Sequence, residues 1–364
     1  MRLGTCIALE LVVAAGAAYG AWLGVGQGIR LVGDYVAGKE AIAATAAPSP
    51  AGALTPQRLP RAHLEVAPPA PPRNVFGAPD EVLLAPLGAA PVTGVRINQG
   101  GTSLSLRIDF ANGARAAFKP EQIHPQSDPR REIAAYRLDR LLGIGRVPPA
   151  RAISFSVDEL IAAAEPRHRT YITRRLTEEG LVRDGRLHGE LSWWIPELRF
   201  AKLGSLALDE PEGRELWTSY LQVGAVIPDD ARDMVAQIAA LAMFDVLIDN
   251  PDRWTGANTR MSPDGKTLYF MDNSFSFSTF TFGRTPNLTA LRRIQVFPRE
   301  LVERMRALTA DQLASAFALA DDHGLGPLLT PEEVRSILSR RDNLMRYIDR
   351  LIEEHGEDAV LAFP

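Results

Sequence analysis

The stretch FDVLIDNPDRW, residues 244–254, limits the possible folds more than any other part of this chain. It closes an apolar run in which hydrophobic residues recur at helical spacing behind two aspartates, which predicts a mostly buried helix over residues 231–248. Pro251 cannot continue that helix and pushes Asn250 out of helical geometry. Asp252 is therefore predicted on a loop that a rigid helix holds in place.

This polar loop has two interpretations. Asn, Asp and Pro are ordinary stop signals after a core helix, and the segment taken alone favours that interpretation. Loops held by a rigid scaffold are also where catalytic groups concentrate. The rest of the chain has to decide between a helix stop and a catalytic loop.

The composition narrows the class of protein. The chain has 364 residues, 46% hydrophobic and 23% charged, which is typical of a globular protein with one large or two small domains. A net charge of -4 without a basic run argues against a nucleic-acid partner. The single cysteine, Cys6, excludes an intrachain disulfide. The sequence contains no HExxH, G-x-S-x-G or Walker motif.

The N-terminal region is predicted to lie outside the catalytic fold. Residues 3–25 are apolar apart from Glu10 and follow Arg2, which is about the length needed to cross a bilayer. We therefore expect a transmembrane signal anchor over residues 1–28, with a cleaved signal peptide as the alternative. The flanking charges are balanced and do not set the orientation of the anchor.

A Pro- and Ala-rich segment follows the predicted anchor. Residues 45–81 are dense in both residue types and have little periodicity, which is typical of an extended, solvated linker. The predicted linker spans residues 29–81. The folded part is expected to begin at about residue 82.

Residues 92–120 contain the clearest β pattern in the chain. Apolar residues alternate with polar ones on both sides of Asn112-Gly113, a two-residue hairpin signal, and Gln99-Gly100-Gly101 marks an earlier turn. These signals predict three antiparallel strands. Lys119 is expected at the end of the third strand.

A helix is predicted over residues 128–143. Asp128 suits its N-cap, Pro129 its first position and Gly143 its C-terminal end. Glu132 stands in the first turn, where a carboxylate is favourable for the helix dipole alone. The alternative is that Glu132 pairs with Lys119.

Two further segments complete the pattern. Residues 268–271 read as a short strand that delivers Asp272 into a second polar loop, and residues 330–356 read as a long capped helix. The order is three strands with a lysine, a helix with a glutamate, a buried helix with an aspartate loop, a strand with an aspartate, then helices. This order predicts an α+β, two-lobed protein-kinase-like fold, with a small antiparallel N-lobe over residues 82–190 and a larger, mainly helical C-lobe over residues 191–364.

Six motifs, in this order, resemble a known family: AAFKP, REIAAYRLDRLLGIGRVPPAR, GELSWWIPELRFAK, MFDVLIDNPDRW, LYFMDNS and LRRIQVF. They are similar to those of the atypical secretory-pathway kinases typified by the Golgi casein kinase, the glycosaminoglycan xylose kinase and four-jointed. The similarity covers roughly residues 93–310. It implies a kinase that uses ATP and either Mn²⁺ or Mg²⁺.

The resemblance also assigns roles to individual residues. Lys119 matches the lysine that binds nucleotide phosphates, and Glu132 matches the helix glutamate that orients it. Asp252 matches the catalytic aspartate, and Asp272 matches the metal-binding aspartate. Phosphoryl transfer depends mainly on positioning and charge stabilisation, which is what such a set of residues supplies.

The resemblance places an inter-lobe hinge at SWWIP, residues 192–196. The backbone of Ser192, Trp193, Trp194 and Ile195 is then expected to contact adenine. The two indole rings have two interpretations. They pack the hinge as core residues, which is the commoner role of a buried aromatic, or one of them stacks on the nucleobase.

The chain departs from the family pattern at the metal site and beside the catalytic aspartate. Trp254 stands where the casein-kinase branch has a histidine. Ser127 stands where that branch has a second acidic metal ligand, and the neighbouring Asp128 is its one candidate replacement. By analogy with other kinases, Asn258 is a candidate second metal ligand.

The function predicted from these residues is ATP-dependent phosphorylation of a hydroxyl acceptor, with protein Ser/Thr preferred. The alternatives are a sugar (glycan) kinase and a catalytically inactive pseudokinase scaffold. A lipid kinase is disfavoured, because no basic patch lies near the anchor. The expected partners are a protein or glycan acceptor and, through the N-terminal segment, a membrane. The family implies a luminal or extracytoplasmic catalytic domain, whereas the need for ATP favours the cytoplasm if the source is bacterial, so the side of the membrane stays open. The sequence gives no oligomeric state.

Overall fold

The computed structural model describes residues 74–98, 102–254, 258–318 and 323–364, which fall within one structural unit, Ala67–Pro364. The predicted anchor, most of the predicted linker and the predicted turn at residues 99–101 lie outside the described residues. Within those ranges, no helix combines the length and the apolar character needed to cross a membrane.

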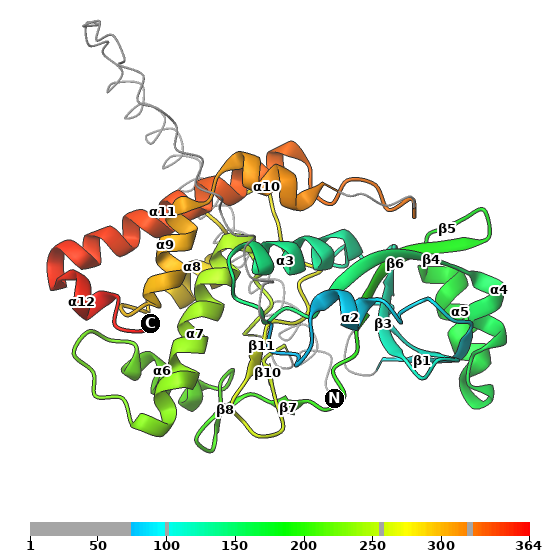
Figure 1. The fold of residues 1–364 in the computed structure, drawn as a ribbon, viewed down its shortest axis with the longest axis horizontal. Helices are drawn as coiled ribbons and strands as arrows, with labels where there is room; N and C mark the ends of the chain where they lie inside the picture. Colours follow the sequence, from blue (N-terminus) through cyan, green and yellow to red (C-terminus); the bar gives the residue numbers. More distant parts are fainter. Residues whose placement is uncertain (1–73, 99–101, 255–257, 319–322) are drawn as a thin grey trace, which may run out of the picture. The chain divides into compact units, whose positions relative to one another are not determined.

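An antiparallel sheet forms one side of the unit (Figure 1). Its strand order is β1-β2-β3-β6-β4, with the short β5 paired to β6. The strands are β1 (Val92–Ile97), β2 (Leu106–Phe110), β3 (Arg115–Pro120), β4 (Ala150–Ser156), β5 (Val182–Arg183) and β6 (Arg186–Trp193). The three predicted strands, β1 to β3, are confirmed, whereas β4, β5 and β6 were not predicted.

The sheet and two helices enclose a hydrophobic core of their own. The alternation along β2 and β3 brings Leu106 opposite Phe118 and Ile108 opposite Ala116, and all four side chains are buried. This face packs with the helices α4 (Val157–Ala162) and α5 (Arg169–Glu179). Because one face is buried, the register of β3 is fixed, and Lys119 at its end is fixed with it.

Helix α3 (Pro129–Leu141) lies between the sheet and the helices of the C-terminal half of the chain (Figure 1). As predicted, Asp128 is its N-cap: the side chain accepts a hydrogen bond of 3.0 Å from the backbone N–H of Arg130, and Pro129 occupies the first position. Gly143 follows the helix with φ +66°, a left-handed geometry that a side chain would strain.

The other side of the unit is mainly helical. Its helices are α6 (Pro211–Tyr220), α7 (Asp229–Ile248), α8 (Thr285–Leu291), α9 (Arg299–Ala307), α10 (Ala310–Phe317), α11 (Pro331–His355) and α12 (Glu357–Val360). Two small sheets accompany them, one of β7 (Arg199–Phe200), β10 (Arg260–Met261) and β11 (Leu268–Tyr269), the other of β8 (Lys202–Leu203) and β9 (Leu206–Ala207). Before the sheet lies α2 (Asp80–Leu84), and η1 (Pro166–His168) is a short 3-10 helix between α4 and α5.

The predicted buried helix is α7, and it is the centre of the larger hydrophobic core. It ends at Ile248 as expected, but the helical conformation is lost at Asp249, before Pro251 would force Asn250 out of it. Asp249 already takes a left-handed conformation, with φ 58° and ψ 50°, and its buried carboxylate accepts hydrogen bonds from Arg284 N–H and the Asn287 side chain. The long C-terminal helix, α11, begins with the predicted capping box of Thr330 and Glu333.

Candidate active site

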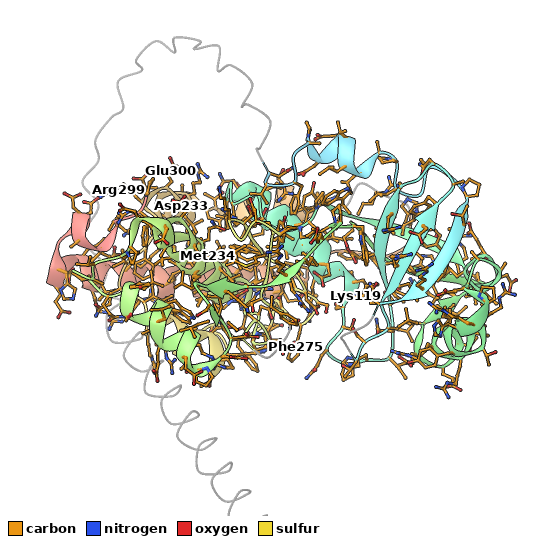
Figure 2. All side chains as sticks on the ribbon, turned by 90° about the horizontal axis from the view of Figure 1, so that it is seen from below. Lys119, Asp233, Met234, Phe275, Arg299 and Glu300 are labelled. Atoms are coloured by element: carbon orange, nitrogen blue, oxygen red, sulfur yellow. The ribbon has the colours of Figure 1, made fainter. Side chains whose placement is uncertain are left out.

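A cavity of about 340 Å³ lies where the sheet, α3 and the loops of the helical side meet. Its lining comes from β3, β4, β6, β10, α3 and the loops after β1, α3, β6, α7 and β11. The predicted site residues in this lining are Lys119, Glu132, Ser192, Trp193, Trp194, Ile195, Asn258 and Asp272. Figure 2 shows Lys119 at the junction between the sheet and the helical side.

Lys119 is the central cation of this cavity. Its Nζ donates to Oε1 of Glu132 at 2.7 Å, to Oδ1 of Asp272 at 2.9 Å and to Oγ of Ser274 at 3.2 Å. An ammonium group has three donors, so this set uses all of them. Burial alone would lower the pKa of Lys119, but the carboxylates of Asp272 and Glu132 raise it above its ordinary value. Lys119 therefore stays charged.

Glu132 connects α3 to two other parts of the site. While Oε1 accepts from Lys119, Oε2 accepts from the backbone N–H of Asn273 at 2.9 Å. The carboxylate is buried and both of its oxygens are used. Of the two interpretations of Glu132, the geometry supports the pair with Lys119, because a dipole interaction alone would leave the side chain in solvent.

Asp272 follows β11 and faces the cavity. Its backbone is left-handed, with φ 55°, and its side chain remains 50% exposed although Oδ1 is bonded to Lys119. The positive charge of Lys119 lowers the pKa of Asp272, so the carboxylate is ionised. A charged, partly exposed oxygen ligand of this kind can take a hard cation.

The predicted catalytic loop and the Asp272 loop are linked by Asn250. Its Oδ1 accepts from the backbone N–H of Asp252 at 3.1 Å, and its Nδ2 donates to the carbonyl of Asp272 at 3.1 Å. Asn258, which lines the cavity, donates to Oδ2 of Asp252 at 2.9 Å. Asp252 does not itself line the cavity; it is joined to the cavity wall through Asn258.

Arg253 braces both loops from inside, a role that the sequence did not reveal. It is fully buried and pairs with Asp245 of α7, with Nε to Oδ2 at 3.1 Å. Its guanidinium also donates to Oδ1 of Asn273 at 2.7 Å and to the carbonyl of Met271. Burial raises the pKa of Asp245 to about 6 although Arg253 opposes this. The signal in the sequence was the short separation between Asp245 and Arg253. Because α7 ends between them, the arginine can fold back from the loop onto the helix.

Glu190 is a further buried carboxyl of the cavity that sequence reasoning missed. It lies on β6 directly opposite Lys119 of β3, lines the cavity and is 3% exposed. Burial, followed by the charge of Glu132, raises the pKa of Glu190 to about 8, while Lys119 and a hydrogen bond from Ser192 oppose the rise. Glu190 is therefore mostly protonated at neutral pH.

Glu190→Gln should reduce the pH dependence of folding stability between about pH 5 and pH 8. Unfolded glutamate ionises near pH 4.5, whereas folded Glu190 keeps its proton up to about pH 8. The folded state thus binds more protons in this window, and the wild type loses stability as the pH rises through it. Thermal melts from pH 5 to pH 9 should show the variant gaining on the wild type with rising pH. A constant difference would contradict the buried, protonated state.

The predicted hinge residues line the cavity, and both indole rings contact neighbours. The Trp193 ring packs edge-on against Phe76 at 5.6 Å, and the Arg107 guanidinium lies 5.9 Å from the Trp194 ring. The backbone N–H of Trp193 donates to the carbonyl of Pro149 at 2.9 Å. Packing against Phe76 supports the core interpretation for Trp193, and a nucleobase contact by either ring stays a prediction.

The acidic groups alone do not form a metal cage. Across the described ranges, no cluster of three or more His, Cys, Asp or Glu side chains could hold a metal ion. Asp128 is a poor replacement for the missing ligand, because its carboxylate caps α3 and pairs with Arg130 at 2.7 Å. Beside it, the buried hydroxyl of Ser127 has no hydrogen-bond partner. Asp272 and Asn258 remain the predicted ligands, a set that suits a cation that also takes oxygens from nucleotide phosphates.

Comparison with known sequences gives distant relatives along most of the chain, although no family model matches. Mouse "pseudokinase FAM20A" is 26% identical over 73% of this chain and 57% of its own length. Human "extracellular serine/threonine protein kinase FAM20C" is 21% identical over 77% and 56%. "Glycosaminoglycan xylosylkinase" of Danio rerio is 23% identical over 80% of each chain. The chain thus spans little more than half of the first two relatives.

Solved structures show the same fold. The Golgi casein kinase with Mn and ADP bound superposes with a TM-score of 0.59 at 18% identity over 78% of both chains. Hydra Fam20 with sugar has a TM-score of 0.59 at 16% identity, over 76% of this chain and 90% of that one. The predicted two-lobed, kinase-like α+β fold is confirmed. By sequence and by fold, the chain is a relative of the atypical secretory kinases represented by FAM20A, FAM20C and glycosaminoglycan xylosylkinase.

Proposed function

We propose that this protein is an ATP-dependent phosphotransferase that phosphorylates hydroxyl groups, with Ser/Thr of a protein as the preferred acceptor. One observation carries the proposal: Lys119 is held between Glu132 and Asp272 in a cavity that the hinge residues also line. Any buried lysine needs a carboxylate partner. Lys119 also faces a cavity beside the partly exposed Asp272, the position from which an ammonium group neutralises and orients phosphates.

Each residue has a separate role in this proposal. Lys119 binds the nucleotide phosphates. Glu132 of α3 keeps the ammonium group in place through its hydrogen bond to Lys119 Nζ. Asp252 accepts or orients the proton of the acceptor hydroxyl, a task for an ionised side chain within hydrogen-bond reach. Asn258 donates to the Asp252 carboxylate, which fixes its direction.

Asp272 and Asn258 would hold Mn²⁺ or Mg²⁺ together with the phosphates. A bound divalent cation supplies charge neutralisation on the transferring phosphoryl group. For Asp272 to serve, Lys119 has to share or release its bond to Oδ1. Incoming phosphates offer Lys119 an alternative anion, so nucleotide and cation should bind more tightly together than separately.

The adenine end of the cavity is the hinge. All four predicted hinge residues line the cavity: Ser192 and Trp193 are the last residues of β6 and pair with β3, whereas Trp194 and Ile195 follow the strand. Backbone N–H and C=O groups at such a position can recognise a purine edge. The apolar rings then exclude water from the base.

A glycan acceptor is the second candidate. The alignment with the xylosylkinase covers 80% of that protein, whereas the alignment with the protein kinase covers 56%. The two acceptors share the same chemistry at the attacking hydroxyl. They differ in the surface that binds the rest of the acceptor.

We also propose that the N-terminal segment anchors the protein to a membrane as a single-pass span, with the catalytic domain on the extracytoplasmic side. The support is the apolar run over residues 3–25 and the Pro-rich segment after it. Protease protection in sealed vesicles tests both statements. Digestion of the catalytic domain from the cytoplasmic side only would contradict the orientation.

The function is tested by coupling nucleotide binding to transfer. With Mn²⁺ or Mg²⁺, ATP should raise the melting temperature, and labelled phosphate should pass to a casein or xyloside acceptor. Asp252→Asn should keep the melting shift and lose transfer about 10²- to 10⁴-fold, the range of general acid–base catalysis. A melting shift without transfer to either acceptor or to water would indicate a scaffold. No shift at millimolar nucleotide would remove ATP from the proposal.

A further inference from the structure

The first described residues, 74–80, form a short segment that we call the N-terminal strap. Its shape is fixed by Asn74, whose Oδ1 accepts from Phe76 N–H at 2.8 Å and whose Nδ2 donates to the carbonyl of Ala78 at 2.8 Å. The backbone N–H of Val75 donates to the carbonyl of Gly145, after α3, at 3.0 Å. The strap is thus tied to itself and to the folded unit.

Phe76 connects the two sides of the cavity. Its ring stacks on Tyr269 with centroids 5.7 Å apart and planes 16° apart, and it meets the hinge ring of Trp193 edge-on at 5.6 Å. Tyr269 ends β11, the strand that leads to Asp272. One aromatic side chain therefore contacts both the hinge and the strand before the proposed metal ligand.

Asp80 connects the strap to α3. Its carboxylate accepts hydrogen bonds from Nε of Arg140 at 2.6 Å, from Nη2 of Arg140 at 3.0 Å and from the hydroxyl of Tyr136 at 3.0 Å. Both partners of the ion pair are 9% exposed at the side chain. The Arg140 guanidinium also lies 4.8 Å from the Tyr136 ring and 5.9 Å from the Phe76 ring.

The partners of Asp80 lie on the same stripe of α3 as Glu132. Glu132, Tyr136 and Arg140 follow one another at intervals of four residues, a spacing that puts side chains on one face of a helix. A movement of α3 that broke the contacts to Asp80 would therefore also move Glu132 away from Lys119. The desolvation penalty of this buried ion pair offsets most of its attraction, so its net contribution to folding stability is small. Its bidentate geometry nevertheless holds α3 in one position relative to Asp80.

We propose that Phe76 and Asp80 are positioning residues, through which the N-terminal strap holds α3 and the hinge so that Glu132 keeps Lys119 in its working orientation. This inference rests on the proposed function for its consequence in catalysis. Its structural part, the dependence of α3 on the strap, does not need any activity. The segment that joins the folded unit to the N-terminal region is then part of the catalytic apparatus.

Full-length Asp80→Asn and Phe76→Leu test the proposal. Each should lower kcat for phosphoryl transfer about tenfold or more, because small misplacements of reacting groups are costly, while KM for ATP changes less. Amide hydrogen exchange of residues 129–141 without nucleotide should become faster in both variants. Asp80→Glu, which keeps the charge, should recover part of the rate and of the protection.

Two controls separate positioning from a general loss of fold. Glu357→Gln removes an exposed ion pair with Arg299, which Figure 2 shows far from Lys119, and Tyr171→Leu removes an aromatic ring that two arginines contact on α5. Both controls should keep wild-type kcat and wild-type exchange in α3. Equal rates and equal exchange in the strap variants and the controls would overturn the proposal.

The exchange measurement also separates this inference from the proposed function. A wild type without transfer activity but with strap-dependent protection of α3 would refute the kinase proposal and support the strap contact. Active strap variants with wild-type kcat and faster exchange would show a merely structural strap and overturn the positioning role. A fall in kcat that only follows the folded fraction at the assay temperature would overturn it as well.

Discussion

Asp272→Asn is expected to slow metal-dependent phosphoryl transfer about a thousandfold while the protein stays folded. Among the described residues that line the cavity, Asp272 has the one partly exposed carboxylate, and the substitution removes its charge. Cation stabilisation of a phosphoryl group is worth several kcal/mol, and each 1.36 kcal/mol is a factor of ten in rate. The backbone should tolerate the change, because Asp272 has φ 55° and Asn adopts left-handed geometry readily.

A matched control is Asp184→Asn, which makes the same chemical change at another left-handed position, φ 49°, in the turn between β5 and β6. Transfer is measured with Mn²⁺ and with Mg²⁺, and folding is followed by circular dichroism and thermal melting. The control should keep full activity. Wild-type rates for Asp272→Asn under saturating metal would refute the assignment of Asp272 as the metal ligand.

Arg253→Leu is expected to destabilise the protein by about 3–5 kcal/mol, the cost of breaking a buried ion pair and leaving one charge unpaired. Arg253 and Asp245 are 0% and 1% exposed at the side chain, so water cannot replace the lost partner. For a unit of this size, about 1 kcal/mol shifts the melting temperature by roughly 2–4 °C. Thermal melts should therefore show a drop of about 10 °C.

The double variant Asp245→Leu/Arg253→Leu isolates the cause of this effect. It removes the stranded carboxylate as well, so it should melt above the Arg253→Leu single variant. Catalysis should nevertheless stay impaired in the double variant, because Arg253 also holds the carbonyl of Met271 and the side chain of Asn273 next to the metal ligand. A double variant no more stable than Arg253→Leu would mean that Asp245 is not the source of the instability.

Local sequence signals accounted for the elements that carry the main site residues. Helix α3 has a capping aspartate and a proline at its first position. Strand β2 alternates throughout and β3 alternates up to Phe118, so Lys119 and Glu132 were placed correctly on these elements. These signals act over a few residues, and tertiary contacts did not overrule them. The end of α7 was also predicted correctly, although Asp249 breaks the helix before Pro251 acts on Asn250.

Other features have no local signal. Glu190 is a polar residue in a strand where its neighbours Gly189 and Leu191 are buried too, so β6 shows no alternation of buried and exposed positions there. The sequence therefore predicted neither β6 nor the position of Glu190 opposite Lys119. The strap belongs to a segment whose composition predicts a solvated linker. Phe76 and Asp80 pack only because Tyr269, Trp193 and Arg140, distant in sequence, converge on them.

Local residue patterns were enough to identify the charged groups and the kind of element on which each one stands, because caps, alternation and proline breaks act within a few residues. Which of these groups meet depends on tertiary packing. It joined Lys119 to Asp272 across 153 positions and Arg140 to Asp80 across 60. Such pairings depend on the burial and packing of whole elements, whose energies are distributed over many contacts, and no local pattern of residues specifies them.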